Sequence, residues 1–87
     1  MIVVKSNRKG KRFMVEIKGK TIHFGSDVGD TYIDHKDKNK RDKYIARHKV
    51  REDWTKINAG SLSRYLLWGQ HTNLQDNIKD YKKRFNI

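Results

Sequence analysis

RFMVEIKGKTIHF, residues 12–24, contains two short runs in which apolar and polar side chains alternate. The apolar members of the two runs are Phe13, Val15, Ile17, Ile22 and Phe24. Because successive side chains of a β-strand point to opposite faces of the sheet, this alternation is typical of strands that are buried on one face. Lys18, Gly19 and Lys20 separate the two runs and indicate a tight turn. We therefore predict a β-hairpin whose apolar face carries these five side chains.

The alternation continues upstream of the hairpin, where Ile2 and Val4 are two residues apart. The segment from Ser6 to Lys11 is polar and contains Gly10, which is typical of a turn. The opposite faces of these strands are mainly polar, as expected for a sheet that is covered on one side. The first quarter of the chain therefore predicts an antiparallel β-meander of about three strands, near residues 1–5, 12–17 and 20–25.

Helix signals replace the alternation after a turn-rich connection that contains Gly25 and Gly29. Asp34 or Asp37 can cap the first helix. Thr72 and Gln75 have the spacing of a capping box before the last helix. Apolar residues recur along one face of that helix, at Leu74, Ile78, Tyr81 and Phe85. We predict an α+β fold in a single domain, residues 1–87, whose three helices lie near residues 38–52, 60–68 and 73–85.

The composition limits the kinds of protein that this chain can be. Hydrophobic residues make up 34% of the 87 residues, so we expect a small core in which the nine aromatic side chains supply much of the buried area. The absence of cysteine excludes disulfides, a thiolate zinc site and a thiol nucleophile. The longest apolar runs are four residues, far short of the ~20 of a membrane span. We expect neither a membrane protein nor a secreted one.

The charge is strongly positive, with 21 basic and 10 acidic residues and a formal net charge of +11. Residues 1–25 carry seven basic and one acidic side chain, residues 26–54 eight and seven, and residues 55–87 six and two. The excess therefore lies towards the two ends of the chain. A compact fold with this charge is stabilised by a polyanion, of which nucleic acid is the commonest. An anionic membrane surface or an acidic protein face satisfies the same electrostatics.

Two groups of cations are candidates for binding nucleic acid. The first lies in the predicted turn between the first two strands, and the second follows one face of the predicted middle helix, where residues 40, 43 and 47 are neighbours. Their members are Arg8, Lys9, Lys11 and Arg12, and Lys40, Lys43 and Arg47 with Arg51 beside them. Long flexible side chains in such positions can contact phosphates. The alternatives are a turn that only aids solubility and a helix whose cations are paired with Asp42, Glu52 and Asp53.

Other patterns suggest chemistry but have simpler interpretations. The four histidines lack the short paired spacing of a zinc site. Asp27, Asp30, Asp34 and Asp37 suggest a divalent cation or a metal-dependent nuclease, but aspartates are also common in turns and helix caps. Trp54, Tyr65 and Trp68 can stack on unpaired bases, and they can equally belong to the core. We assign no catalytic residue, no metal site and no cofactor.

Much of the chain resembles a family of small basic proteins of large double-stranded DNA viruses, including algal viruses and related phage or metagenomic sequences. The residues that carry the resemblance are His35-Lys36-Asp37, Arg41, Tyr44 to His48, Arg51-Glu52, Trp54, Ala59-Gly60, Ser63-Arg64, Leu66 to Trp68, Ile78, Asp80 and Arg84-Phe85, with Thr21 to Gly25 before them. This sequence departs from the family in having Tyr65 where a second tryptophan is common. The departure leaves the predicted core unchanged.

The resemblance implies a viral setting without assigning an active site, and the protein would then coat the genome or lie in the virion shell. We expect a protein that binds nucleic acid, DNA rather than RNA, without sequence specificity. The alternatives are a virion structural protein, in the role of a minor capsid or cement protein bound to capsid proteins, and, third, a metal-dependent nuclease. The expected location is the virion or the interior of the infected cell. We expect no membrane partner and no small-molecule substrate, and the sequence does not define the oligomeric state.

Overall fold

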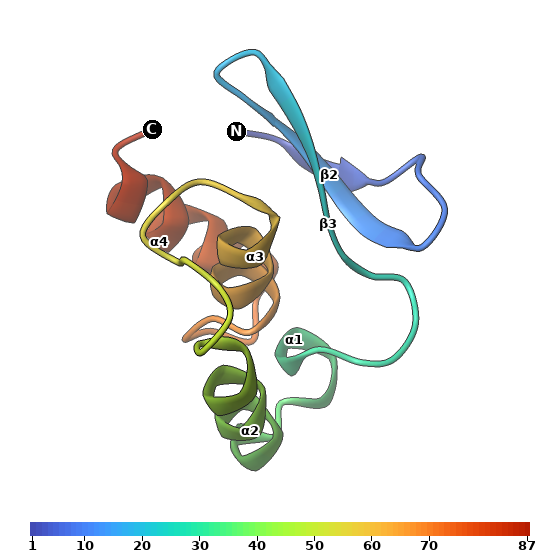
Figure 1. The fold of residues 1–87 in the computed structure, drawn as a ribbon, viewed down its shortest axis with the longest axis vertical. Coiled ribbons are helices and arrows are strands. Elements are labelled where there is room, and N and C mark those ends of the chain that lie inside the picture. Colours follow the sequence, from blue (N-terminus) through green and yellow to red (C-terminus); the bar gives the residue numbers. More distant parts are fainter.

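The computed structural model describes residues 1–87 as an α+β fold, in which an N-terminal sheet precedes a group of helices (Figure 1). The strands are β1 (Val3–Lys5), β2 (Lys11–Ile17) and β3 (Lys20–Ser26). The helices are α1 (Tyr32–His35), α2 (Lys38–His48), α3 (Ala59–Leu62), the π-helical turn η1 (Ser63–Leu67) and α4 (Leu74–Phe85). The predicted fold class is confirmed, and no helix has the length and apolar character that crossing a membrane requires.

The sheet is antiparallel with the order β1-β2-β3, as expected for a meander. Phe13 lies opposite Phe24, and Val15 lies opposite Ile22, so the predicted apolar residues share one face. Lys18 and Gly19 have φ angles of 51° and 79°, which make the tight turn between β2 and β3. A left-handed backbone at both turn positions matches the twist of the two strands, and glycine adopts it at no steric cost.

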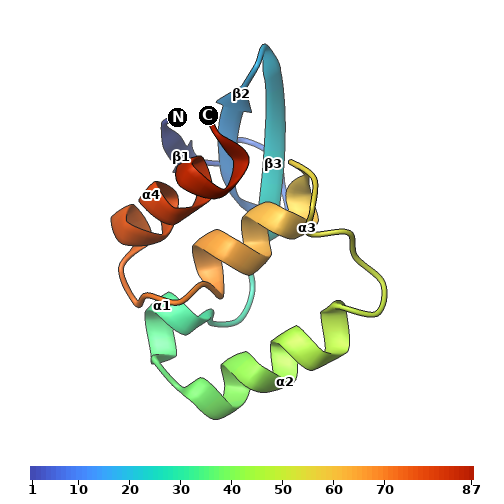
Figure 2. The same ribbon diagram turned by 90° about the vertical axis from the view of Figure 1, so that its left-hand side faces the viewer.

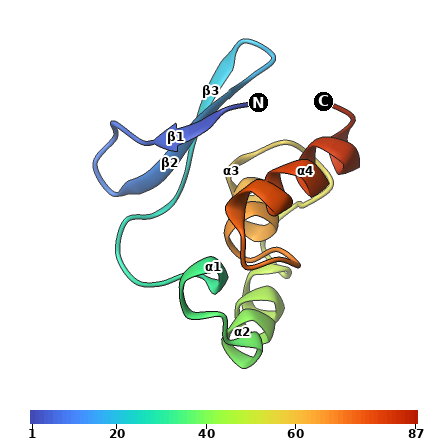
Figure 3. The ribbon, with the colours of Figure 1, turned by 180° about the vertical axis from the view of Figure 1, so that it is seen from behind.

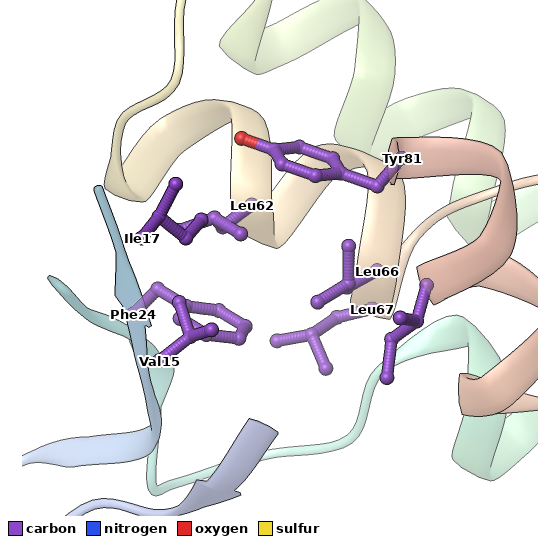
Figure 4. Close-up of a cluster of buried hydrophobic side chains, with 8 residues drawn as sticks. Val15, Ile17, Phe24, Leu62, Leu66, Leu67 and Tyr81 are labelled. Carbon is purple, nitrogen blue, oxygen red and sulfur yellow. The ribbon is translucent and has the colours of Figure 1, made fainter. Parts of the chain in front are cut away.

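The helices cover only one face of this sheet (Figures 2 and 3). The core forms where α3, η1 and α4 pack on β2 and β3, and its side chains point towards one another from both layers (Figure 4). Its buried members are Val15, Ile17, Phe24, Leu62, Leu66, Leu67, Ile78 and Tyr81. The Tyr81 hydroxyl group is 2.8 Å from the Ser61 hydroxyl, so its polar end is satisfied inside the core. Burial raises the pKa of Tyr81 above its ordinary value of 10.0.

The boundaries of the helices differ from the predicted ones in three places. The short helix α1 was not predicted; Thr31 begins it through a capping box with Asp34. The middle helix ends at His48 rather than near residue 52. The N-cap of α4 is Asn73, which accepts hydrogen bonds from the next turn, so the predicted capping box at Thr72 is wrong by one residue. Such errors are expected because caps depend on local geometry that periodicity does not specify.

Asn77 fixes the connection between η1 and α4 from inside the protein. Its side chain is fully buried, and its amide group donates to the carbonyl oxygens of Leu66 and His71 at 2.9 Å each. Its Oδ1 atom accepts from the backbone N–H of His71 at 3.0 Å. Gly69 lies against this amide, where a Cβ atom would be 2.7 Å from Asn77 Oδ1 and 2.2 Å from the Tyr65 carbonyl oxygen. The close approach therefore requires glycine.

Candidate nucleic-acid interface

A cleft of about 430 Å³ lies between the β3–α1 connection, the second half of α2 and the start of the α3–η1 segment. Lys11 and Arg47 both line it, although they are 36 residues apart in the sequence. These two residues belong to the two separate groups of cations that the sequence suggested. The fold therefore brings one member of each group to the same cleft.

Stacked aromatic rings form one wall of the cleft. The Tyr44 ring lies between His48 and Trp68, with centroid distances of 4.1 and 4.3 Å and interplanar angles of 23° and 3°. Burial, followed by the negative charge of Glu52, raises the pKa of Tyr44 to about 12. Trp68 and Trp54 are each half-buried, so neither belongs wholly to the core or wholly to the surface. The stack holds the second half of α2 against the end of η1.

Glu52 binds two neighbouring side chains and does not neutralise the cations of α2. Its Oε2 atom is 2.6 Å from His48 Nδ1, and its Oε1 atom accepts a hydrogen bond from Trp54 Nε1 at 2.9 Å. Asp53, the next carboxylate, lies 4.0 Å from Lys56. The alternative in which Asp42, Glu52 and Asp53 pair with the basic face of α2 is therefore not what the structure shows.

Very few of the basic side chains have an acidic partner. Of the 21 lysines and arginines, only Arg12 and Lys56 lie within 4.0 Å of a carboxylate oxygen. The other two ion pairs of the protein, His48 with Glu52 and His71 with Asp80, use histidine. Because charges that are not paired within the fold remain available to an external anion, the positive charge of this chain is a property of its surface.

The β1–β2 loop and the adjoining strand ends form an open groove of about 530 Å³ with no hydrophobic lining residue. Lys5, Arg8, Lys9 and Lys11 all line it and are all exposed. One carboxylate, that of Asp27, also lines the groove. Lys11 lines both this groove and the cleft, so the two hollows adjoin each other. Lys5 was missed in the sequence because it ends a predicted strand, and its position next to the polar turn was the available signal.

Arg12 has a structural role, unlike the other cations that were predicted in this loop. Its guanidinium group donates to the carbonyl oxygens of Ser26 and Gly29, and to Asp34 Oδ2 at 3.2 Å. These bonds tie β2 to the connection between β3 and α1. These internal hydrogen bonds use three of the five N–H donors of Arg12, and its predicted phosphate contact stays a prediction.

Asp34 is the carboxylate that accepts a hydrogen bond from Arg12. Partial burial raises its pKa, but hydrogen bonds from the Thr31 backbone and hydroxyl, with the charge of Arg12, lower it below the ordinary value of 3.8. The ionised form is thus favoured in the folded protein. Its contribution to stability is present above about pH 4 and is lost as the pH falls through the lowered pKa of the folded state.

Replacement of Arg12 by glutamine is expected to lower the free energy of unfolding by about 1 kcal/mol, because charge-assisted hydrogen bonds at a partly exposed site are worth this much. Its affinity for DNA is expected to change no more than that of Lys20→Gln, a variant with the same loss of charge. Urea titration and a DNA-binding titration measure the two effects. A large selective loss of DNA affinity with unchanged stability would show that Arg12 contacts phosphate.

The cations of α2 lie on one flank of the helix. Lys40, Lys43 and Arg47 are exposed and lie at helical spacing, as predicted. Arg51 was predicted to lie beside them on the same helix, but α2 ends before it, and Arg51 is exposed in the turn where its N–H bonds to the His48 carbonyl oxygen. Arg47 alone of these four lines the cleft.

Two of the four aspartates that suggested a metal site are used in helix caps. Asp34 belongs to the capping box of α1, and Asp37 is the N-cap of α2, accepting from the N–H groups of Asn39 and Lys40. His35 accepts a hydrogen bond from the Asp37 backbone at 2.9 Å through Nδ1. The protein contains no group of three or more His, Cys, Asp or Glu side chains that could hold a metal ion.

The fold and this surface define a small basic α+β domain with an open groove lined mainly by cations, beside a cleft that Lys11 and Arg47 line together with Asp30 and Glu52. The chain belongs to a family of unknown function, DUF5754, whose model matches residues 1–48. The match spans the β1–β2 loop and α2, and hence all the cations of the two predicted groups except Arg51. No curated protein and no solved structure matches the chain.

Proposed function

We propose that this protein binds nucleic acid, without sequence preference, through a basic surface made of the β1–β2 groove and the cleft beside it. The observation that carries the proposal is the position of Lys11, which lines both hollows and joins the loop cations to Arg47. None of Lys5, Arg8, Lys9, Lys11 and Arg47 has a carboxylate partner within the fold. We call these five residues the basic surface.

The chemistry of the basic surface favours phosphates over bases. Lysine and arginine side chains on an exposed loop can follow a phosphate backbone, and such contacts position a protein on nucleic acid without reading its sequence. The resemblance to proteins of double-stranded DNA viruses supports DNA as the partner, in a virion or an infected cell. The genome-coating role that this setting implies needs affinity for any sequence, which phosphate contacts supply.

The double variant Lys11→Gln, Arg47→Gln tests whether the cleft and the groove act as one surface. If each residue neutralises one phosphate, the slope of log affinity against log salt becomes less steep by roughly 1.8, since each contact contributes about 0.9. Affinity for a short duplex is measured by fluorescence anisotropy over a series of salt concentrations. Lys18→Gln, Lys20→Gln is the matched control, because it removes two exposed charges at the β2–β3 turn, away from the basic surface (Figure 1).

The outcome separates local contacts from general charge. We expect the control to have nearly the same slope of log affinity against log salt as the unchanged protein. Equal losses in the two variants would mean that only net charge matters, and the basic surface would then have no special role. An unchanged slope in the Lys11→Gln, Arg47→Gln variant would show that the cleft is not part of the interface.

A virion structural protein is the second candidate, and the uncovered face of the sheet favours it. Ile2 is 77% exposed and Val4 44% exposed, and together with Met14 they line an open apolar hollow of about 450 Å³. An exposed apolar patch is typical of a surface that contacts another protein. Cosedimentation with purified capsid shells that is lost in Ile2→Ser, Val4→Ser but kept in the Lys11, Arg47 variant would favour this function.

A further inference from the structure

A further group of cations lies around the end of η1, and none of its members lines the cleft or the β1–β2 groove. Arg41 donates from Nε to the carbonyl oxygens of Trp68 and Gly69 at 3.2 and 2.7 Å. Arg64 donates from Nη1 to the same Trp68 oxygen at 2.8 Å. Arg84, near the end of α4, lies close enough to act electrostatically on Arg64. Three guanidinium groups thus gather at one short segment of the chain.

Aromatic rings hold two of these arginines in place. The guanidinium carbon of Arg64 is 5.3 Å from the centre of the Trp54 ring and 4.9 Å from that of Tyr65. The corresponding distance from Arg84 to Tyr65 is 4.1 Å. Guanidinium groups over rings are attracted by the negative ring face. We call these residues, Trp54, Arg64, Tyr65 and Arg84, the arginine ladder.

The contacts of Tyr65 indicate what the arginine ladder can recognise. Besides the two guanidinium groups, the ring has Trp54, Tyr81 and Phe85 within 6.5 Å of its centre. Because these groups surround the ring, Tyr65 orients arginines and is not a platform on which a base stacks. The exposed donors of Arg84 therefore suit an anion, and a planar donor fork suits phosphate in particular.

The ladder carries positive charge that nothing in the fold neutralises. No carboxylate lies within 4.0 Å of Arg41, Arg64 or Arg84. The Nε atom of Arg64 is buried without a hydrogen-bond partner. Burial, followed by the charge of Arg41, lowers the pKa of Arg64 below its ordinary value. Gathering like charges in a partly buried place is unfavourable, and a bound anion would offset that cost.

A hollow next to the ladder provides room for such an anion. Its volume is about 300 Å³, and Tyr65, Gly69, Gln70, Lys83 and Arg84 line it. One carboxylate, that of Asp80, also lines it, and this group is 2.9 Å from His71 Nε2. The two basic residues of the lining, Lys83 and Arg84, are exposed, so an anion can reach them from solvent.

We propose that the arginine ladder and this hollow form a second phosphate-binding site, so that one chain can hold two nucleic-acid strands at once. The β1–β2 loop and α4 lie on opposite sides of the molecule (Figures 1 and 3). The protein measures 35 × 28 × 25 Å, and the hollow beside the ladder shares no lining residue with the groove or the cleft of the basic surface. The bridging of two strands rests on the proposed function of the basic surface, whereas phosphate binding at the ladder does not.

Bridging is tested with one duplex fixed to beads and a second, labelled duplex in solution. The unchanged protein is expected to capture the labelled duplex on the beads. Lys83→Gln, Arg84→Gln is expected to bind the fixed duplex with no more than a few-fold loss of affinity, yet to capture at least tenfold less of the second. The control Lys18→Gln, Lys20→Gln, with the same net charge, is expected to retain capture. Sedimentation under the same conditions shows whether the protein that joins the two duplexes is a monomer or a dimer.

A titration with inorganic phosphate tests the ladder independently of any nucleic acid. The side-chain N–H resonances of Arg64 and Arg84 are expected to shift on addition of phosphate, and the shift of Arg64 is expected to be lost in Lys83→Gln, Arg84→Gln. Protein that binds the fixed duplex but captures no second one overturns the inference and leaves the proposed function standing. Capture by a dimer, or equal capture by the ladder variant, also overturns it. Failure to bind any duplex, with the phosphate shifts present, overturns the proposed function instead.

Discussion

Gly69→Ala is expected to lower the free energy of unfolding by at least about 3 kcal/mol, a large part of the ~4 to 13 kcal/mol that is typical of a domain of this length. A Cβ atom at this position would be 2.2 Å from the Tyr65 carbonyl oxygen. That oxygen belongs to the backbone of η1, and the neighbouring Asn77 amide already makes three hydrogen bonds, so neither can move without breaking other contacts. Overpacking against fixed atoms is strongly destabilising.

Urea unfolding followed by circular dichroism measures the loss, with Gly10→Ala as the control. Gly10 has a φ angle of 84°, but a Cβ atom at this position would meet no other atom within 4 Å. That substitution therefore carries only the backbone cost of about 1 to 2 kcal/mol. A loss at Gly69 no larger than that at Gly10 would mean that the connection between η1 and α4 yields easily. Asn77 would then not hold this connection rigidly.

Replacement of all five residues of the basic surface by glutamine is expected to weaken duplex binding by at least two orders of magnitude at about 50 mM salt. Five neutralised phosphates correspond to a slope of roughly −4.5, so the affinity of the unchanged protein falls about 500-fold between about 50 and 200 mM salt. The variant loses the free energy of binding that these five phosphate contacts supply. Only the cations outside the basic surface still attract the duplex. Fluorescence anisotropy with a labelled duplex measures both the affinity and the slope.

The matched control removes five exposed lysines that lie outside the basic surface, so that both variants have a net charge of +6. These lysines are Lys18, Lys20, Lys36, Lys38 and Lys79. We expect the control to bind within about tenfold of the unchanged protein, since distant exposed charges are screened over ~10 Å. If the control binds as weakly as the surface variant, the interface is spread over the whole molecule.

The sheet and its buried face could be predicted from the sequence because period-two alternation reports directly on which side of a strand is covered. Val15, Ile17 and Phe24 were expected on that face, and all three are buried. The helix α1 escaped prediction because four residues are too few for a periodic signal. Asp34, which completes the capping box of α1, belongs to a series of aspartates whose spacing resembled a metal site.

The sequence predicted the cations of the candidate interface as two separate groups. It did not predict that the fold brings the two groups together. The spacing of Lys40, Lys43 and Arg47 placed them on one helix flank, and the structure agrees. Nothing in a sequence gives the distance between Lys11 and Arg47, which depends on how the β3–α1 connection turns α2 towards the sheet. The internal role of Arg12 was hidden for the same reason, because its acceptors at Ser26 and Gly29 come close only in the fold.

The salt dependence of duplex binding by the unchanged protein shows whether phosphate contacts hold it on nucleic acid. Anisotropy titrations at several salt concentrations, repeated with duplexes of unrelated sequence, give the slope of log affinity against log salt. We expect a slope of roughly −4.5 or steeper that is the same for every sequence, since phosphates neutralised by the basic surface release their counterions. A slope near zero, or no binding even at low salt, would mean that the protein does not bind nucleic acid through the phosphates.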